Sequence, residues 1–220
     1  MILALVFVLA GAPEALADAE ALALISAMPS RYAAVADYRC RFTKQERVAG
    51  KLLPEEEMRM QFMAPFAVRL RWVGRVHRGR EALYVRGKNQ DRIRARQGGL
   101  LRLFSVNLDP TGKSAMKDNR HPLTEIGIGH VVEALGRDLD RARAKGELGL
   151  AATAEAGLVR IELSFAGEGY YAPRQRVWID RGLGLPTRIE VYDGRQDLLE
   201  RYEYRDLKLN TGLTERDFEP

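Results

Sequence analysis

Apolar and polar side chains alternate with a period of two along most of this chain, and that alternation limits the folds open to it. It is clearest in the segments 38–43, 58–62, 66–72, 92–96 and 159–165, and it returns in shorter form around 177–179, 189–191 and 202–204. Successive side chains of a β-strand point to opposite faces of a sheet. The pattern therefore predicts many strands that share one apolar face and one polar, arginine-rich face.

Turn residues separate the predicted strands at short intervals, among them Gly50, Gly74, Gly87 and the pair Asp193-Gly194. An Asp-Gly pair is a strong signal for a tight hairpin turn. Parallel strands need a crossover of a dozen or more residues, and these intervals are too short for one. We therefore expect antiparallel pairing.

Two segments carry a helical period instead. Apolar residues recur at three- and four-residue spacings over residues 20–35, where Pro29 is expected to kink or split the helix. A second apolar stripe runs over residues 124–145, with Thr124 as its candidate cap, and Gly146 is placed to end it. Both helices are predicted to be amphipathic.

The predicted fold class is α+β, and mainly antiparallel β. The order is helix, strands, a less regular segment over residues 98–122, a second helix and further strands. An antiparallel sheet with only two helices to cover its apolar face must curl around them. We expect the segment 98–122 to be loop and to be the most mobile part of the molecule.

The chain begins with an apolar run, Ile2–Ala12, followed by the small-x-small sequence Ala15-Leu16-Ala17. This is typical of a secretory signal peptide, and the run is far shorter than the about 20 apolar residues of a membrane-spanning helix. We expect residues 1–17 to be removed and residues 18–220 to form a single domain in the periplasm. No basic residue precedes the run, so a buried N-terminal helix of a cytosolic domain is the alternative.

Cys40 is the one cysteine of the 220 residues, so no disulfide can form within the chain. Its place in the alternation puts it on the apolar face, where we expect a buried and unreactive thiol. The net charge is +5, and loss of Glu14 with the signal peptide raises it to +6. Such a charge suits an anionic partner such as a membrane surface. Nucleic acid is not expected, because aromatic side chains do not interleave with the arginines of the polar face.

The familiar catalytic motifs are incomplete or missing. Thr111–Ser114 ends like a phosphate-binding loop, but Asn107 stands where that motif needs glycine, and no third glycine follows Gly127 and Gly129 as dinucleotide binding requires. The chain has neither Gly-x-Ser-x-Gly nor His-Glu-x-x-His. These motifs therefore give no support to nucleophilic, nucleotide or zinc-protease chemistry.

A mixed metal site of His121, Glu125, His130 and Glu133 can be drawn on the predicted helix and the residues before it. The spacing of these residues is equally that of ordinary polar side chains on a helix surface. We adopt the second interpretation, and we predict neither a metal nor another cofactor.

The segment 119–125 is a dense polar cluster that leads directly into the second helix. Pro122 fixes the entry, and Thr124 or Glu125 can satisfy free helix amides. We interpret the cluster as a capping and anchoring segment, with a contact to a ligand or partner as the alternative. His121 is a candidate for a pH-responsive latch within it.

Several strings resemble a bacterial exported family that is described as a domain of unknown function. They are Tyr38-x-Cys40-x-Phe42-x-Lys44-Gln45-Glu46-Arg47, Gly79-Arg80-Glu81, Leu108-Asp109-Pro110 and, most specifically, Asn119-Arg120-His121-Pro122-Leu123-Thr124-Glu125-x-Gly127-Ile128-Gly129. The resemblance spans about Asp37 to Pro220. The ending, Asp206–Leu213 followed by Asp217-Phe218, is similar to the last strand and tail of the outer-membrane lipoprotein carriers, which share the LolA/LolB-like fold.

That resemblance implies a strongly curved, unclosed β-barrel of about ten or eleven strands, with two main helices in or over its concave face. The carriers hold acyl chains against the apolar concave face. The residues of that face here, and thus the candidate ligand-binding residues, are Met58, Met60, Phe62, Val68, Leu70, Trp72, Leu163, Phe165, Ile179 and Ile189. An arginine of the carriers latches the helices, and the candidates here are Arg47, Arg69 and Arg120. Asn119, His121 and Glu125 complete the lid or latch candidates.

Three functions are compatible with the sequence. The first is a monomeric periplasmic protein that binds or transfers a lipid or lipid-modified partner in an apolar concavity and performs no catalysis. The second is an envelope enzyme that acts on a glycan or lipid with His121 and Glu125 as acid and base. The third is a module that senses or scaffolds envelope proteins through its basic face.

Overall fold

The computed structural model describes residues 14–99 and 103–219, and it is built around one large antiparallel sheet. The N-terminal part holds β1 (Glu14–Leu16), α1 (Asp18–Ala33), β2 (Asp37–Val48), β3 (Lys51–Leu52), β4 (Glu56–Met63), β5 (Ala67–Trp72), β6 (Glu81–Val85), β7 (Ile93–Arg96) and β8 (Ser105–Leu108). Then follow α2 (Lys113–Met116), α3 (Ile128–Lys145), β9 (Leu148–Glu155), β10 (Leu158–Phe165), β11 (Arg174–Asp180), β12 (Leu185–Tyr192) and β13 (Leu198–Leu209). Short 3-10 turns lie at Asn89–Asp91, Leu123–Glu125 and Glu215–Phe218.

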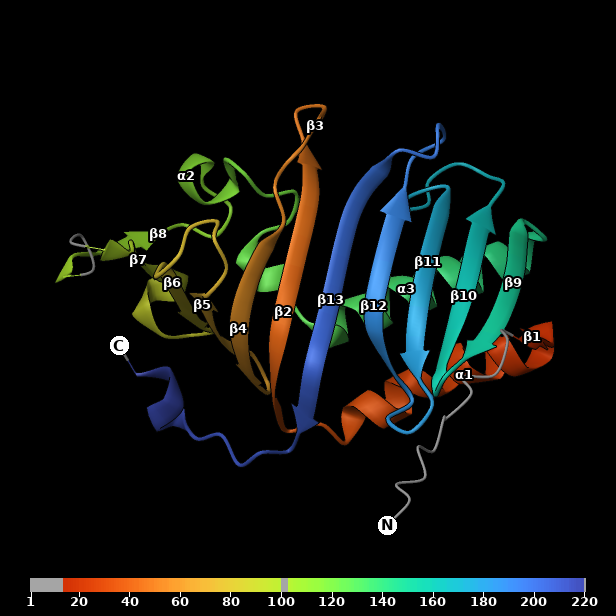
Figure 1. The fold of residues 1–220 in the computed structure, drawn as a ribbon, viewed down its shortest axis with the longest axis horizontal. Helices are drawn as coiled ribbons and strands as arrows, with labels where there is room; N and C mark the ends of the chain where they lie inside the picture. The colour runs from red at the N-terminus through yellow and green to blue at the C-terminus, as the bar shows by residue number, and fades with distance from the viewer. Residues whose placement is uncertain (1–13, 100–102, 220) are drawn as a thin grey trace, which may run out of the picture.

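The sheet has 13 strands in the order β1-β9-β10-β11-β12-β13-β2-β4-β5-β6-β7-β8, with β3 paired to β2 at the side. All strand pairs are antiparallel, as the short intervals between turns predicted. The longest strands, β2 and β13, pair with each other, and this pair joins the half of the sheet that holds β2 to β8 to the half that holds β9 to β13. The sheet bends but does not close, because β1 and β8 lie at its opposite edges (Figure 1).

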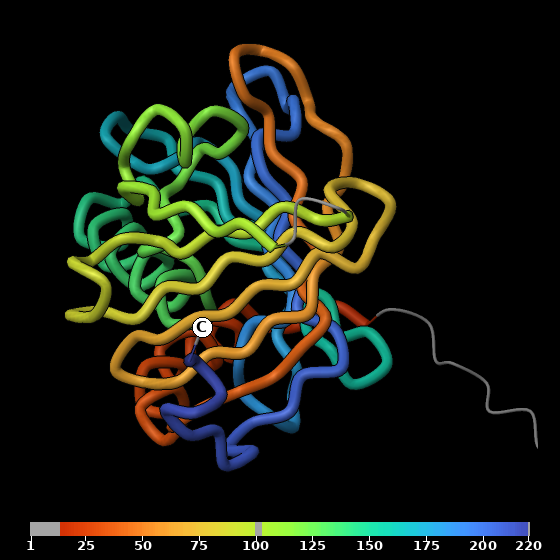
Figure 2. The backbone as a smooth tube through the Cα atoms, turned by 90° about the vertical axis from the view of Figure 1, so that its left-hand side faces the viewer, coloured from red at the N-terminus to blue at the C-terminus, as the bar shows by residue number. Residues whose placement is uncertain are grey.

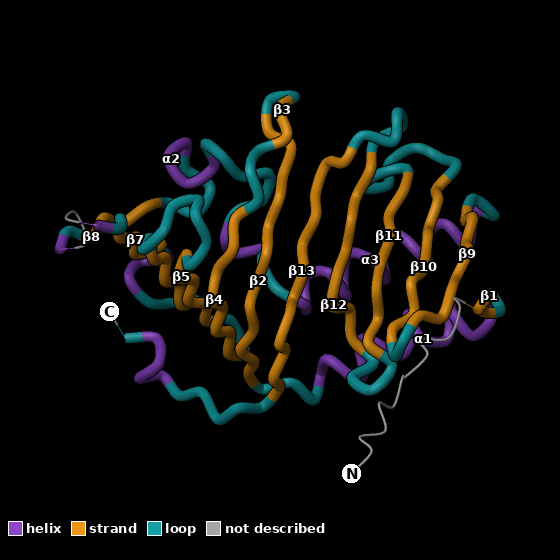
Figure 3. Tube along the Cα trace, in the orientation of Figure 1, coloured by secondary structure: helices purple, strands orange, loops and turns teal. Residues whose placement is uncertain are grey.

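Helices α1 and α3 lie against the same face of the sheet, which is its concave face (Figures 1 and 2). Figure 3 shows the same separation by element type, with α1 and α3 in purple behind the orange strands. The apolar stripe of α3 is buried against this face and consists of Ile128, Val131, Val132, Leu135, Leu139 and Ala142. The expected α+β class, with a curved open sheet and two main helices, is confirmed.

The two long helices differ in detail from the sequence-based prediction. Helix α1 continues through Pro29 and is not split. Helix α3 begins at Ile128 and not at Thr124, because residues 123–125 form a separate 3-10 turn. Gly127 then has a φ of +110°, which glycine adopts easily and other residues do not. A Cβ atom at Gly127 would lie 2.7 Å from the Tyr38 hydroxyl oxygen, and the same hydroxyl accepts the backbone N–H of Ile128.

Three further local predictions concern Gly146, Cys40 and the segment 98–122. Gly146 ends α3 in the left-handed conformation, as predicted. Cys40 is buried, and burial raises the pKa of its thiol, which agrees with an unreactive cysteine. The segment 98–122 is more regular than expected, since it contains β8 and α2.

The expected signal peptide overlaps the beginning of the structure. Its residues 1–13 lie outside the described residues, and residues 14–16 form β1, which pairs with β9. Cleavage after Ala17 stays a prediction. Among the described helices, none is long and apolar enough to cross a membrane.

The C-terminal tail is attached to the start of β2 through one buried carboxylate. Asp37 accepts hydrogen bonds from the Thr211 amide and hydroxyl, both at 2.7 Å, and from the Gly212 amide at 3.1 Å. Burial alone would raise the pKa of the Asp37 carboxyl, but these hydrogen bonds outweigh burial and lower its pKa. Asp37 therefore contributes stability that is present above its unfolded-state pKa and is lost as the pH falls through the lowered folded-state pKa.

Substitution Asp37→Asn should lower the free energy of unfolding at pH 7 by about 1–3 kcal/mol, because charge-assisted hydrogen bonds are lost. Urea denaturation at neutral and acid pH measures the effect. The difference from wild type should shrink as the wild-type carboxyl becomes protonated. The control is Asp206→Asn, whose side chain is 76% exposed, and it should change stability little at either pH. An effect of Asp37→Asn that persists unchanged at acid pH contradicts this account.

Candidate functional site

Two buried carboxylates face each other on the concave side of the sheet. Glu46 of β2 and Glu200 of β13 are cross-strand partners, and they are only 3% and 2% exposed. Both lie on the concave side because they continue the alternation of their strands, Glu46 after Phe42 and Glu200 before Tyr204. Like charges placed directly opposite each other destabilise a sheet, so this pair needs partners.

The segment 119–125 supplies several of those partners, as its Asn-Arg-His sequence reaches the sheet. The Arg120 guanidinium pairs with Glu200, and the backbone N–H of Arg120 donates to Glu46 at 2.9 Å. The Arg120 side chain also donates to the Arg47 backbone carbonyl at 3.1 Å. His121 places its Nε2 3.2 Å from Glu200. Arg120 therefore contacts both strands where the two halves of the sheet meet.

Two tyrosines complete the hydrogen bonds of these carboxylates. The Tyr171 hydroxyl, from the loop between β10 and β11, donates to Glu200 and lies 2.6 Å from Nε2 of His121. The Tyr202 hydroxyl donates to Glu46. One network thus joins the segment before α3, the loop between β10 and β11, and the sheet. We call it the rim anchor, and it consists of Glu46, Arg120, His121, Tyr171, Glu200 and Tyr202.

A second group extends the rim anchor toward β4 and β5. Lys44 pairs with Glu56 at 3.3 Å and with Glu46 at 3.6 Å, and it donates to the side-chain oxygen of Asn119. Glu56 in turn accepts the indole N–H of Trp72. The concave face thus carries charged residues at one end and apolar residues along the rest.

The network lowers the pKa of Glu200 and raises the pKa of His121. Burial would raise the pKa of Glu200, but the hydrogen bonds from His121, Tyr171 and Arg120 outweigh burial and lower it. Burial would lower the pKa of His121, but Glu200 and Glu125 outweigh burial and raise it. Both shifts favour the charged forms, which attract each other.

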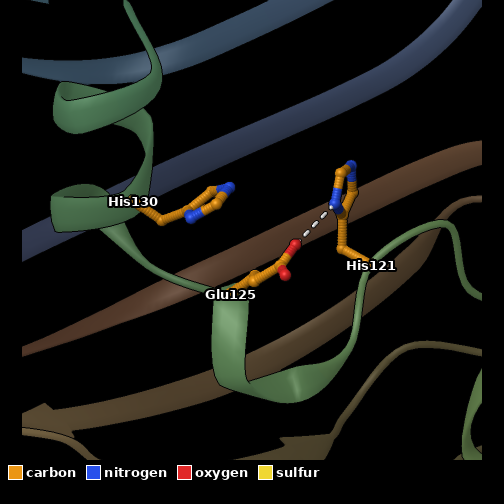
Figure 4. A group of neighbouring side chains, drawn as sticks. All are labelled: His121, Glu125 and His130. Atoms are coloured by element: carbon orange, nitrogen blue, oxygen red, sulfur yellow. Dashed lines mark hydrogen bonds and ion pairs between the residues drawn. The ribbon is translucent and has the colours of Figure 1, made fainter. Parts of the chain in front are cut away.

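His121 also contacts a second carboxylate and lies near a second histidine (Figure 4). Its Nδ1 lies 3.1 Å from Glu125, and its ring centre lies 6.1 Å from that of His130 at the start of α3. One ligating atom from each of the three residues lies within 4.8 Å of the others. Burial lowers the pKa of His130, which favours its neutral imidazole. Glu133 is not part of this group and lies 3.9 Å from Arg137 instead.

His121 and Glu125 are in contact, as the acid-base hypothesis requires, but neither ring nitrogen of His121 is free. A general base needs a ring nitrogen within reach of its substrate. Nδ1 of His121 faces Glu125, and Nε2 faces Tyr171 and Glu200. Both nitrogens are therefore engaged in this arrangement.

The ten candidate cavity residues lie together on the concave face, but they are packed. Nine are buried, and Trp72 is partly buried against the same core cluster. Their side chains share one core cluster with the apolar side chains of α1 and α3, and these two helices pack mainly against β9 and β12. A ligand on this face therefore requires a helix to move.

The latch candidates differ in whether they join the segment before α3 to the sheet. Asn119, Arg120 and His121 contact the sheet, and Glu125 contacts His121. The Arg47 side chain points to the start of β13, where it donates to the Leu198 carbonyl. Arg69 pairs with Glu81. Arg120 is thus the arginine that joins the segment before α3 to the sheet.

Sequence reasoning did not select the residues that hold this segment against the sheet, directly or through one another. They are Lys44, Glu46, Glu56, Tyr171, Glu200 and Tyr202. A signal was present for Lys44 and Glu46, because their even spacing from Phe42 places two charged residues on the apolar face of β2. No local signal marks Tyr171, which lies in a loop.

One prediction about the arginines of the convex face is wrong. These arginines are largely paired with carboxylates, as where buried Glu190 accepts from Arg201 at 2.9 Å and also contacts Arg188. Aromatic side chains do interleave with these arginines, contrary to expectation: the Arg188 guanidinium lies 4.5 Å from the ring centre of Trp178. The expectation was wrong because it was based on the N-terminal strands, where the arginine rows are longest.

Comparison with protein families gives one match. The model of a family described as a protein of unknown function (DUF1571) matches residues 35–220. The expected resemblance to a family of this description is therefore confirmed over most of the chain. No curated protein matches the sequence significantly.

Several solved structures resemble the chain distantly. A LolA superfamily protein from Nitrosomonas europaea is 10% identical with a TM-score of 0.34, over 91% of this chain and 97% of that one. The lipoprotein LppX from Mycobacterium tuberculosis is 13% identical with a TM-score of 0.46, over 90% and 99%. A chain of the MucA/MucB complex from Pseudomonas aeruginosa is 15% identical with a TM-score of 0.49, over 91% and 61%.

Substitution Arg120→Met should lower the free energy of unfolding by about 3 kcal/mol, because it leaves Glu200 buried without its guanidinium partner. Chemical denaturation at pH 7 measures the loss. Adding Glu200→Gln should recover part of it, since the amide removes the unpaired charge.

The matched control is Arg137→Met on the exposed side of α3, where the pair with Glu133 spans 3.9 Å at the surface. Such exposed pairs contribute at most about 0.5 kcal/mol. Equal losses for Arg120→Met and Arg137→Met refute the role of Arg120 in the rim anchor.

Proposed function

The chain belongs to the DUF1571 family, and from that premise we propose that it is a binding protein of the bacterial envelope that holds acyl chains on its concave face. The ligand is a lipid or the lipid-modified part of a partner protein. Binding involves no catalysis. Helix α3 is the movable element, and the acyl chain takes the place of its apolar stripe.

The observation that carries this proposal is the pairing of an apolar concave face with a helix that has polar attachments at its edges. The face is lined by methionines and aromatic side chains, among them Met58, Met60 and Phe62. Methionine fills irregular apolar space and adapts to different neighbours. Such a surface suits flexible acyl chains better than a ligand of fixed shape.

The exchange of α3 for an acyl chain is close to balanced in free energy. Burial of one methylene contributes about 0.8 kcal/mol, so a sixteen-carbon chain contributes roughly 12 kcal/mol before ordering costs. The α3 stripe contains five larger side chains, Ile128, Val131, Val132, Leu135 and Leu139. At about 1.5–3 kcal/mol each, their burial is of similar size. A ligand can therefore replace the helix without an external energy source.

The polar attachments of α3 are of a kind that can break and form again. Beyond the rim anchor, Asp138 accepts a hydrogen bond from Gln175 of β11 at 3.1 Å. Arg141 donates to the Gly169 carbonyl at 2.7 Å in the loop between β10 and β11. Each such bond contributes about 1 kcal/mol net, because water replaces it when the helix leaves.

The proposed setting is the periplasm, where the protein acts as a monomer. The apolar run ahead of Asp18 supports export, and a single cysteine is compatible with an oxidising compartment. The net charge of +5 favours weak attraction to anionic membrane surfaces, the source of lipids and lipid-modified partners.

Two tryptophans allow a direct test, because they lie on opposite faces of the sheet. Trp72 pairs with Met58 on the concave face, whereas Trp178 lies among the arginines of the convex face. A fatty acid with a quencher on its acyl chain should quench Trp72 at short range. The variant Trp178→Phe, which keeps Trp72, should therefore lose most of its fluorescence on titration.

The matched variant Trp72→Phe, which keeps Trp178, should be quenched little by the same probe. Mass spectrometry of the denatured protein, purified from the envelope fraction, should also find a co-purified lipid. Equal quenching of the two variants contradicts binding on the concave face. Absence of quenching together with absence of co-purified lipid rejects the proposal and leaves the sensing or scaffolding function.

A further inference from the structure

His121, Glu125 and His130 form a group whose composition matches the ligands of a transition-metal site (Figure 4). Two imidazoles and a carboxylate suit Zn²⁺ and metals of similar softness, whereas Mg²⁺ and Ca²⁺ prefer oxygen ligands alone. The three residues come from three consecutive local structures: the loop before the 3-10 turn, the turn itself and the first turn of α3. The sequence spacing alone favoured ordinary surface residues. In the structure, one possible ligand atom from each of the three residues lies within 4.8 Å of the others, which favours a metal site.

The tautomer of His121 is set by its sheet-side contacts. The Tyr171 hydroxyl donates to Glu200 and therefore accepts from His121, so the Nε2 atom of His121 carries a hydrogen. In the neutral ring, Nδ1 then has a lone pair. That lone pair faces the Glu125 carboxylate oxygen at 3.1 Å. A proton on Nδ1 fills this place in the charged ring, and a metal cation can take the place of that proton.

The distances fit a metal ion with small adjustments. Zinc bonds of about 2.0–2.1 Å in a tetrahedral site separate the ligand atoms by about 3.3 Å. The His121–Glu125 separation of 3.1 Å is already close to that value. The group as a whole spans 4.8 Å or less, so rotation of the His130 and Glu125 side chains can close it. Glu125 is exposed at the surface, which leaves an entry path and room for a water as fourth ligand.

Glu200 provides the support that metal-binding histidines usually have. A ligating histidine commonly donates its other ring N–H to a carboxylate, which fixes its orientation and increases its basicity. Here Nε2 of His121 lies 2.6 Å from the Tyr171 hydroxyl, which itself donates to Glu200, and 3.2 Å from buried Glu200, which pairs with Arg120. The orientation of His121 is therefore established before any metal arrives.

We propose that His121 through Nδ1, the Glu125 carboxylate and the His130 imidazole bind Zn²⁺ or a similar divalent transition metal, with Glu200 as the supporting carboxylate. The bound ion links the segment 121–125 to the first turn of α3. Because Glu200 belongs to β13, the metal also strengthens the connection between this end of α3 and the sheet. The site does not depend on lipid binding.

The test uses the untagged, chelator-treated full chain titrated with Zn²⁺ alone and followed by calorimetry. One equivalent should bind, and saturating Zn²⁺ should raise the melting temperature, because a ligand of the folded state stabilises it. His130→Asn should weaken the affinity by tenfold or more. This variant tests the site without disturbing the rim anchor, to which His130 does not belong.

The third histidine of the chain provides the matched control. His77 is exposed and has a φ of +55°, a conformation that asparagine tolerates, so His77→Asn should fold normally and bind Zn²⁺ like wild type. Loss of binding in His130→Asn but not in His77→Asn supports the site. Absence of Zn²⁺ binding by the wild type, or equal binding by both variants, overturns the proposal, whatever the outcome of the lipid experiments.

Discussion

Burial of Glu46 and Glu200 side by side is the constraint on which the arrangement of the concave face depends. They are cross-strand partners at the joint between the two halves of the sheet, and water does not reach them. Two buried carboxylates need hydrogen-bond donors and positive charge in fixed positions. Arg120 supplies both a guanidinium and a backbone amide, and this requirement brings the segment before α3 onto the sheet. The position of α3 is therefore set by the hydrogen bonds and ion pair that Glu46 and Glu200 make with the segment before it.

This constraint gives α3 two kinds of attachment with different properties. Its apolar stripe contributes most of the burial free energy and is not directional, so an acyl chain can replace it. The hydrogen bonds and ion pairs of the rim anchor are directional. They contribute less free energy than the apolar stripe, but they determine the position that α3 takes when it closes again on the sheet. A helix held in this way has one closed position and a modest cost of opening. That combination is what a protein needs to take up and release an apolar ligand.

The sequence predicted the elements better than the contacts between them. The period of two identified the concave residues of β2, β4, β5 and β10, because each strand reports its own faces locally. It missed the start of α3, since the left-handed Gly127 and its contact with Tyr38 arise only from tertiary packing. It also missed Glu200 as the partner of Arg120, 80 residues away in the chain, because the register of β13 on β2 decides that contact. The resemblance of the 119–125 motif indicated where to look but not what the motif binds.

Native-state hydrogen exchange tests the central claim most directly, because it measures the free energy of opening for each element separately. The amides of α3 should exchange through an opening of lower free energy than the amides of β2 and β13. Addition of a single-chain phospholipid should increase exchange in α3 and leave β2 and β13 protected. Exchange of α3 at the same free energy as the central strands, with or without lipid, would show that the helix is a permanent part of the core and would contradict the account.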